Sequence, residues 1–304
     1  MINRSAYKGS TWIDLDSPTA EEARQVMDEF HIDPRVMEEI VLPSLKPKVE
    51  HYRDFIYLIL HFPLFRHTHR STPNQEIDFI IGRRYLVTVR YDPVEPLHNF
   101  AKLLEVQTIL DHEESHEHAG MLFYHMIRRL YAELEYGLDF LRDELTDIEA
   151  KIFEGKEKEM VVSLSQSSRS LLNFKQSVGR HRTILESFDS VATRFFGDDF
   201  SHYSKVILGQ QYRIHNDITA YLDSLSQLRE TNNSLLSTKE NEIMKTLTIM
   251  AFVTFPLTLI AAIFSMDTIH TPLIGNPFDF WIVIGGMATA TIIFFSYFKY
   301  KGWL

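Results

Sequence analysis

Two long apolar runs near the C-terminus constrain the fold of this chain more than any other feature. Residues 243–264, IMKTLTIMAFVTFPLTLIAAIF, contain one charge near their start, and residues 280–298, FWIVIGGMATATIIFFSYF, contain none. Each run reaches the roughly 20 residues that a helix needs to cross the hydrocarbon core of a bilayer. Two buried core helices are the alternative, which a pair of such runs joined by a loop of only 15 residues disfavours. We therefore predict an integral membrane protein with two transmembrane helices.

The lysines around these runs predict the orientation in the membrane. The loop 265–279 has no Lys or Arg, whereas Lys239 and Lys245 lie at the start of the first run and Lys299 and Lys301 follow the second. Because loops rich in Lys and Arg stay in the cytoplasm, both termini are expected there, with the loop outside. The N-terminal stretch has no apolar core, so no cleavable signal is expected. In a bacterial cell the membrane would be the inner membrane.

The charge of the chain is concentrated ahead of the two runs. Residues 243–304 hold three Lys against two Asp, a net charge of +1. Because the whole chain has a net charge of −10, the first 242 residues have a net charge of −11. An acidic surface argues against nucleic acid as a partner and suits a domain that meets cations. The absence of Cys excludes disulfides and thiolate metal sites. Because G-x-S-x-G and a glycine-rich phosphate loop are also absent, we predict no enzyme and no catalytic cofactor.

The N-terminal 118 residues alternate between strand and helix patterns. TWIDL is typical of a strand, and IDFII and YLVTV are typical of a hairpin that turns at Gly82. One helix is expected to begin with Ser17 as its N-cap and Pro18 in the first helical position, and another is expected over 94–110. This alternation predicts an α/β cytoplasmic domain.

Helical patterns take over from Ala119. Residues 119–153 and 158–188 form long periodic stretches, and a third stretch begins near Asp199 and continues into the first apolar run. About 65 residues at 1.5 Å each give a helix of roughly 100 Å, too long to be buried within one small domain. The third stretch carries mostly apolar residues in 4-3 spacing, which predicts a coiled-coil seam and a stalk that packs against copies of itself. The seam consists of Ile214, Ile218, Tyr221, Leu225, Leu228, Asn232 and Leu235.

One face of the first apolar run carries polar and small residues at intervals. Polar residues within a span face protein or water, so we predict that this face lines a pore. The alternative is a stripe of small residues for tight helix packing without a pore. Pro256 is expected to bend the helix, with Thr254 or Thr258 satisfying a freed carbonyl group. The stripe consists of Asn241, Met244, Thr248, Ala251, Phe255, Thr258, Ala262 and Ser265.

The chain resembles a known family over nearly its whole length. TNNSLLSTKENEIMKTLTIMAFVTFPLTLIAAIFSMD, a short loop, the second apolar run and the ending YFKYKGWL resemble the CorA superfamily of divalent-cation channels. That superfamily includes magnesium transporters and the zinc transporter ZntB. WIDLDSPTAEE, LKPKVEHYRDFIYLILHFP and NQEIDFIIGRRYLVTVR are similar to its cytoplasmic domain in the same order. The resemblance implies a homopentameric funnel, in which the first spans line a central pore and the second spans form an outer ring.

The resemblance also implies a function and the roles of single residues. Asn241 and Met244 match the inner gate of the family, Leu247 its hydrophobic constriction and Thr258 its pore threonine. The implied function is passive transport of divalent cations, with Mg²⁺ as the first candidate and Co²⁺, Ni²⁺ or Zn²⁺ as others. The implied partners are further copies of the chain, the lipid bilayer and the transported ion.

The chain departs from the family at the outer end of the pore. The Gly-Met-Asn signature of the family is here Ser265-Met266-Asp267. An asparagine ring presents neutral carbonyl dipoles that suit hydrated Mg²⁺, whereas the carboxylates of an aspartate ring repel one another, attract cations more strongly and select them less finely. Two alternatives therefore stay open. One is a zinc transporter of the ZntB kind, and the other is a non-conducting scaffold or sensor with the same fold.

Three further positions are candidates for the outer mouth, and two for a metal site elsewhere. The Met-Pro-Glu loop of the family is replaced by Thr271, Pro272 and a leucine, so the loop has lost its acid. Asp279 is expected to be the N-cap of the second span, with a place at the mouth as the alternative. His112 and His116 are a tentative zinc site because residues four apart share a helix face, and a solvated polar linker is the alternative.

These patterns together predict an α/β domain followed by long helices and two spans, arranged in six segments. They are a cytoplasmic α/β domain (1–118), long helices and stalk (119–242), a pore-lining span (243–264), an external loop (265–279), a second span (280–298) and a basic cytoplasmic tail (299–304).

Overall fold

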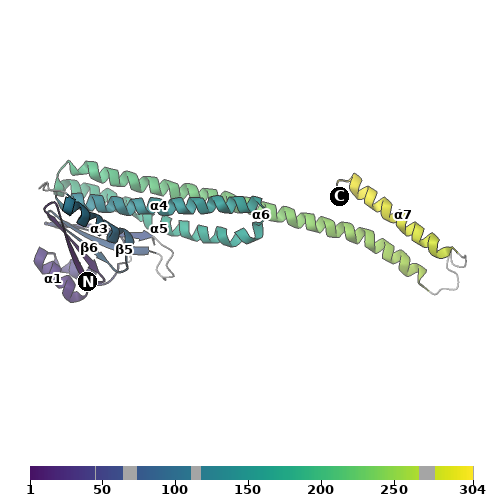
Figure 1. The fold of residues 1–304 in the computed structure, drawn as a ribbon, viewed down its shortest axis with the longest axis horizontal. Helices are drawn as coiled ribbons and strands as arrows, with labels where there is room; N and C mark the ends of the chain where they lie inside the picture. Colours follow the sequence, from purple (N-terminus) through teal and green to yellow (C-terminus); the bar gives the residue numbers. More distant parts are fainter. Residues whose placement is uncertain (45, 64–73, 111–117, 267–277, 304) are drawn as a thin grey trace. The chain divides into compact units, whose positions relative to one another are not determined.

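A computed structural model of the protein describes residues 1–44, 46–63, 74–110, 118–266 and 278–303 (Figure 1). By its internal contacts the chain divides into an N-terminal unit, Met1–Arg229, and a C-terminal unit, Glu230–Leu304. The N-terminal unit combines a six-stranded sheet with long helices, and the C-terminal unit contains two apolar helices. This architecture confirms the predicted fold class of an α/β domain followed by long helices and two apolar helices.

The sheet is mixed, with strand order β1-β2-β6-β5-β4-β3. Strands β2 and β6 pair in parallel, and every other pairing within this sheet is antiparallel. The predicted hairpin is formed by β5 and β6, and its turn follows the pair Ile81 and Leu86. The strands are β1 (Ile2–Tyr7), β2 (Ser10–Asp16), β3 (Lys48–His51), β4 (Phe55–Pro63), β5 (Asn74–Gly82) and β6 (Tyr85–Arg90).

Both faces of the sheet are covered, so its central strands are apolar almost without interruption. On one face, alternate strand residues such as Tyr57 and Ile80 form a core with α1 (Ala20–Phe30) and α2 (Pro34–Glu39). On the other face, Phe79 meets Phe123 of a long helix edge to face, with ring centroids 5.3 Å apart. Because successive side chains of a strand point to opposite faces of the sheet, the strands contribute to two separate cores.

Helix α1 begins two residues later than the sequence predicts. Thr19 is its N-cap and forms a capping box with Glu22, whose backbone N lies 3.2 Å from the Thr19 hydroxyl, while Thr19 N donates to the Glu22 carboxylate at 3.0 Å. Ser17 instead has a left-handed backbone, with φ of 44°. The prediction of Ser17 as N-cap and Pro18 as first helical residue is therefore wrong, because the box satisfies two backbone donors reciprocally.

Five longer helices follow the α1–α2 pair. The long helix that begins at Ala119 ends at Phe153, as predicted, and the third long helix continues without a break into the first apolar run. The helices are α3 (Glu95–Leu110), α4 (Ala119–Phe153), α5 (Glu157–Phe196), α6 (Phe200–Phe264) and α7 (Asp279–Tyr300).

The first half of the predicted seam is buried within a single chain. Ile214 and Ile218 are fully buried and Leu225 is 3% exposed, all within the N-terminal unit. The same part of α6 lies against α4 and α5, since the rings of Tyr124 and Tyr203 meet at 5.0 Å and the Gln211 side chain donates to the Val178 carbonyl at 3.1 Å. The expectation that these seam residues pack against copies of the chain is therefore wrong for this half.

Candidate ion pathway

Two helices of the C-terminal part are long and apolar enough to cross a membrane, judged by length and composition. They are α6 and the segment Phe280–Tyr300 of α7, and almost none of their apolar windows is buried inside the chain. Large apolar side chains such as Phe255, Trp281 and Ile292 are more than half exposed. A single chain thus presents far more apolar surface here than a soluble monomer tolerates, which fits contact with lipid or with further protein.

One face of α6 packs against the C-terminal end of α7. Ile249 and Phe298 are about 95% buried, with exposed fractions of 6% and 5%, and the rings of Phe252 and Phe298 lie 6.4 Å apart. Phe298 in turn stacks on Trp303 at 5.9 Å. Lys245 reaches the same region, where its Nζ donates to the Gly302 carbonyl at 3.2 Å. These contacts define which face of α6 the second span occupies.

The predicted stripe lies largely on the side of α6 that faces away from this contact. At about 100° of rotation per residue, Leu247, Thr258 and Ser265 lie within roughly 20° of the direction opposite Ile249. Leu247 is 55% exposed, and Phe255, which lies roughly 60° from this direction, is 73% exposed. The rest of the stripe spreads from this line toward one flank of the α7 contact. Asn241 and Met244 are exposed, and Thr248 and Ala251 are half-buried.

The hydroxyl groups of the stripe donate their protons to the backbone of their own helix. Thr258 Oγ1 donates to the Thr254 carbonyl at 2.9 Å, Thr248 Oγ1 to Met244 at 2.7 Å and Ser265 Oγ to Ala262 at 2.9 Å. A hydroxyl whose proton is used in this way keeps its oxygen lone pairs for other donors or for a cation. Hard oxygen atoms of this kind suit Mg²⁺ and its water shell.

Helix α6 continues through Pro256, but not by the predicted hydrogen bonds. Thr254 Oγ1 donates to Met250 O at 2.8 Å and Thr258 Oγ1 to Thr254 O, so neither hydroxyl serves the Phe252 carbonyl that proline frees. The prediction is wrong because a helical threonine donates to the carbonyl four residues before it. The Phe252 carbonyl is four residues before Pro256, so neither Thr254 nor Thr258 has the spacing to reach it.

The outer end of the stripe is described only in part. Helix α6 ends at Phe264, and its last turn is closed by Ser265 N, which donates to Ala261 O at 3.0 Å. Met266 follows and is 59% exposed. Helix α7 begins at Asp279 with Phe278 in the N-cap position, so the predicted capping role of Asp279 is wrong. The other predicted positions of this region, Asp267, Thr271 and Pro272, lie outside the described residues.

The tentative histidine site also lies outside the part of the chain that the structure describes. It consists of His112 and His116, in the segment 111–117. Within the described residues, no group of three or more His, Asp or Glu side chains is arranged to hold a metal ion. The described part therefore offers hydroxyl, amide and thioether groups along α6 as its candidate contacts with an ion.

A buried polar network in the sheet was not predicted from the sequence. Asp78 is fully buried and accepts a hydrogen bond of 2.8 Å from the Tyr57 hydroxyl. Burial and then the neighbouring Glu76 carboxylate raise the pKa of Asp78 well above its usual value. Glu76 lies 3.1 Å from His61, and although burial lowers the pKa of His61, this carboxylate raises it overall. The alternation IDFII marks Asp78 as core-facing, but nothing in the sequence names its partners.

His181 of α5 connects this sheet to the long helices. Its Nε2 lies 2.8 Å from the His61 carbonyl, which only accepts, so Nε2 carries the proton and the Tyr131 hydroxyl donates to Nδ1 at 2.8 Å. The ring is fully buried, and this burial lowers the pKa of His181 to about 4. His181 is therefore held as a neutral ring that satisfies both of its neighbours.

Comparison with known proteins extends over almost the full chain. Residues 7–300 match the family described as CorA-like Mg²⁺ transporter protein. A relative from Thermotoga maritima, the cobalt/magnesium transport protein CorA, is 24% identical over 301 residues, which covers 97% of this chain and 83% of the relative. The complete structure of the CorA magnesium transporter from Methanocaldococcus jannaschii superposes with a TM-score of 0.83 at 23% identity, covering 97% of this chain and 92% of that one.

The fold of the ZntB cytoplasmic domain is a weaker match. The crystal structure of that domain from Vibrio parahaemolyticus superposes with a TM-score of 0.62 at 12% identity, covering 75% of this chain and 88% of the domain. This likeness concerns the fold alone. The family match, in contrast, extends from the first strand of the sheet to the last turn of the second apolar helix. The chain belongs to the family of CorA-like Mg²⁺ transporter proteins.

Proposed function

We propose that the chain is one subunit of a membrane channel that conducts divalent cations passively, with Mg²⁺ as the principal ion. The observation that carries this proposal is the stripe on α6, from Asn241 to Ser265, most of which is exposed and lies away from the face occupied by α7. Asparagine and threonine side chains at membrane depth are stable only against protein or water. A ring of such stripes from several copies encloses a polar path through the bilayer.

The channel is proposed to be a homopentamer with α6 inside and α7 outside. In support, α7 is apolar on all sides and carries no Asp, Glu, Lys or Arg between Phe280 and Phe298. Such a helix suits a position between α6 and lipid. Both termini are proposed to lie in the cytoplasm, which the lysines of the tail support, and the membrane is proposed to be the inner membrane if the host is a bacterium.

Different residues of the stripe, together with Leu247 and Asp267, are proposed to have different tasks. Met244, Leu247 and Phe255 are bulky and exposed, so in a closed ring they would form steric constrictions. Thr258 presents a hydroxyl oxygen with free lone pairs, and Asn241 presents an amide. Both groups suit contact with the water shell of a hydrated ion, because Mg²⁺ gives up its waters reluctantly. Asp267, which follows the described end of α6, is proposed to attract cations to the outer mouth.

The choice of ion is proposed from the chemistry of these groups. The pathway offers oxygen atoms and the thioether of Met244, and no thiolate, since the chain has no cysteine. Oxygen donors suit Mg²⁺ and accept Co²⁺, whereas Zn²⁺ and Ni²⁺ favour imidazole or sulfur ligands. The relative from Thermotoga maritima carries cobalt and magnesium in its name. A zinc transporter or a non-conducting scaffold would appear in the following test as a different ion order or as no flux.

The experiment is a flux panel on purified protein in liposomes, with Mg²⁺, Co²⁺, Ni²⁺ and Zn²⁺ tested one at a time. We expect saturable entry of Mg²⁺ and Co²⁺ that increases with an inside-negative potential. Asp267→Ala is expected to slow entry at low ion concentration, where attraction to the mouth limits the rate. Empty liposomes give the background leak. Equal flux through the parent and Asp267→Ala, or no flux at all, would refute the proposal.

A further inference from the structure

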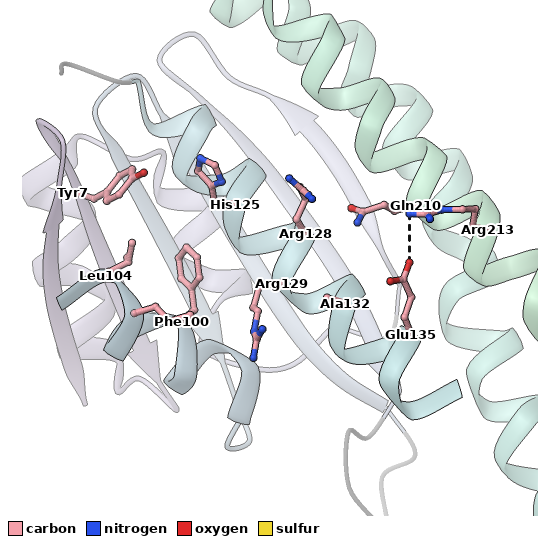
Figure 2. Close-up of a pocket in the computed structure, with 11 residues that line it drawn as sticks. Tyr7, Phe100, Leu104, His125, Arg128, Arg129, Ala132, Glu135, Gln210 and Arg213 are labelled. Carbon is pink, nitrogen blue, oxygen red and sulfur yellow. Dashed lines mark ion pairs between the residues drawn. The ribbon is translucent and has the colours of Figure 1, made fainter. Parts of the chain in front are cut away.

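The N-terminal unit contains a cavity of about 520 Å³ that has no part in the proposed ion path. It lies between β1, α3, α4 and the first part of α6 (Figure 2). Its volume falls in the range of roughly 300–1,000 Å³ that is typical of sites for small molecules. Figure 2 shows Tyr7, Phe100 and Leu104 at one end and Gln210, Arg213 and Glu135 at the other, so the cavity has an apolar and a polar end.

The polar part of the cavity is basic, although the protein as a whole carries a net charge of −10. Among the described residues, three arginines and one glutamate line it. Arg213 lies 3.5 Å from Glu135, and Arg129 lies 4.0 Å from Glu133, outside the lining. Arg128 has no carboxylate within ion-pair distance among the residues that the structure describes. The described lining of the cavity therefore has an excess of positive charge that an anion would balance.

Arg128 is held in place by a neighbouring aromatic side chain. Its Nη1 donates to the Tyr124 hydroxyl at 3.3 Å, and its guanidinium lies 5.4 Å from the centre of the same ring. These two contacts use one edge and one face of the guanidinium, which has five N–H donors in a planar fork. The remaining donors suit the paired oxygens of a phosphate or carboxylate group.

Gln210 supplies a second, independent indication of a ligand. The residue is 8% exposed, and its side-chain Oε1 is buried without a hydrogen-bond donor among the described residues. A buried amide oxygen without a partner costs free energy, so a missing donor is expected at this point. The ligand must then offer a hydroxyl or amino group to Gln210 as well as an anionic group to the arginines.

The apolar end of the cavity restricts the ligand further. Leu103 is 50% exposed there, beside the more deeply buried Phe100 and Leu104. An inorganic anion would leave this wall in contact with water, whereas a flat apolar group would cover it. The three requirements together are an anionic group, a hydroxyl or amino donor, and an apolar body.

We propose that this cavity binds an organic phosphate of nucleotide size, with the phosphate at Arg128 and Arg213, a hydroxyl at Gln210 and the apolar body against Phe100 and Leu103. The site differs from the cation path in its position, its charge and its ligand class. It requires no divalent ion, so it can be tested without any flux.

The test is isothermal titration of the detergent-solubilised full chain, with EDTA present, using AMP, ATP, adenosine and inorganic phosphate as probes. We expect AMP or ATP to bind, and adenosine and inorganic phosphate each to bind at least about 10-fold more weakly, because each lacks one half of the ligand. Absence of binding by both nucleotides at millimolar concentration would overturn the proposal. So would binding of inorganic phosphate as tight as that of AMP, which would identify a simple anion site.

Variants locate the binding in this cavity. Arg128→Ala is expected to weaken nucleotide binding by about 10- to 100-fold, because a charged hydrogen bond to the phosphate is lost. Arg128→Lys should restore part of the loss. Arg182→Ala is the matched control, since Arg182 is exposed and pairs with Glu186 on α5, outside the cavity. Equal binding by the parent, Arg128→Ala and Arg182→Ala would refute the assignment.

Two further variants keep the test decisive if Arg128→Ala does not fold. Leu103→Trp places a larger side chain at a half-exposed position of the apolar wall and should block the cavity without disturbing the core. Gln210→Leu removes the amide oxygen at similar size and should weaken binding by roughly 3- to 30-fold. Thermal unfolding of each variant, measured without ligand, separates a lost contact from a lost fold. Unchanged nucleotide binding by both folded variants would overturn the proposal.

Discussion

The N-terminal and C-terminal units bury their apolar residues to very different extents within one chain. In the sheet, Phe62, Phe79 and Ile80 are fully buried between helices of the same chain. In α6 and α7, Phe255, Leu259 and Trp281 are between 63% and 73% exposed. The first unit thus completes its core alone, whereas the second has a surface that only lipid or further copies can cover. Fold stability and transport are accordingly expected to depend on different units.

The sharpest test of this comparison is the same substitution in both units. Phe79→Ala empties a fully buried site that contacts Phe123 and is expected to cost about 3–5 kcal/mol in the unfolding free energy of the sheet. Phe255→Ala removes a side chain that is 73% exposed and should change that free energy by less than about 0.5 kcal/mol. Hydrogen exchange of sheet peptides in the solubilised protein measures the change in unfolding free energy for both variants. Similar losses of protection in the two variants would contradict the comparison.

A pH test addresses the N-terminal unit alone. His181 has a pKa of about 4 in the folded protein against an ordinary value of 6.5, because it is buried. Since the unfolded state binds the proton more readily, the stability that neutral His181 contributes is complete above pH 6.5 and is lost as the pH falls toward 4. The loss is about 3 kcal/mol.

His181→Gln provides the comparison for this pH test. Its amide can donate to the His61 carbonyl and accept from the Tyr131 hydroxyl, but it does not titrate. The unfolding free energy of the sheet, measured by protection from hydrogen exchange, should therefore decline less steeply from pH 6.5 to pH 4 for the variant than for the parent. The exposed His202 on α6 is the matched control, as His202→Gln should keep the slope of the parent. Parallel pH profiles for the parent and His181→Gln would rule out this contribution.

In the C-terminal unit, loss of a single hydroxyl group should be enough to alter transport. Thr258→Val preserves shape but removes the hydroxyl oxygen from the stripe, and we expect Mg²⁺ flux to change by about 2- to 10-fold, the effect of one hydrogen bond. Thr289→Val is the matched control, because Thr289 of α7 makes the same bond to its own helix, at 2.8 Å to Gly285 O, outside the stripe. If both variants change flux equally, the stripe has no special role in conduction.

The smallest effect is expected at the contact between α6 and the C-terminal tail. Lys245→Met retains most of the apolar stem but removes the hydrogen bond to Gly302 O, so we expect a loss of at most about 1 kcal/mol. Hydrogen exchange should increase in peptides covering residues 298–303. Lys299→Met is the control, since it removes a charge from the same tail and leaves that bond intact. Faster exchange of the sheet in Lys245→Met would show that the two units are not separate in stability.

The pattern of the sequence was sufficient for features that depend on neighbours along the chain. The apolar runs predicted two membrane-spanning helices, and helical periodicity predicted α4 with its observed ends, Ala119 and Phe153. The 3-4 spacing also predicted that the residues of the stripe share a side of α6. Hydrophobic periodicity carries this information because it reports which face of a helix or strand is covered.

The sequence pattern did not reveal what covers each face. Ile214 and Ile218 have the spacing of a seam between copies of the chain, yet α4 and α5 of the same chain bury them. The choice between Ser17 and Thr19 as N-cap depended on Glu22, and both serine and threonine are good caps. In the candidate pathway, the sequence indicated Thr254 and Thr258 as hydrogen-bond donors near Pro256, but not the carbonyl groups that accept from them.

The amino-acid sequence by itself determined the class of this protein, the extent of α4 and the polar stripe within an apolar run. Only the tertiary structure decided that α7 packs at Ile249 and so leaves Leu247 and Thr258 on the opposite side. It alone brought Gln210 and Arg128 to one cavity, although they are far apart along the chain. The physical reason is range: periodicity and capping act over a few residues, whereas burial and the pairing of polar groups depend on segments that meet only in the folded chain.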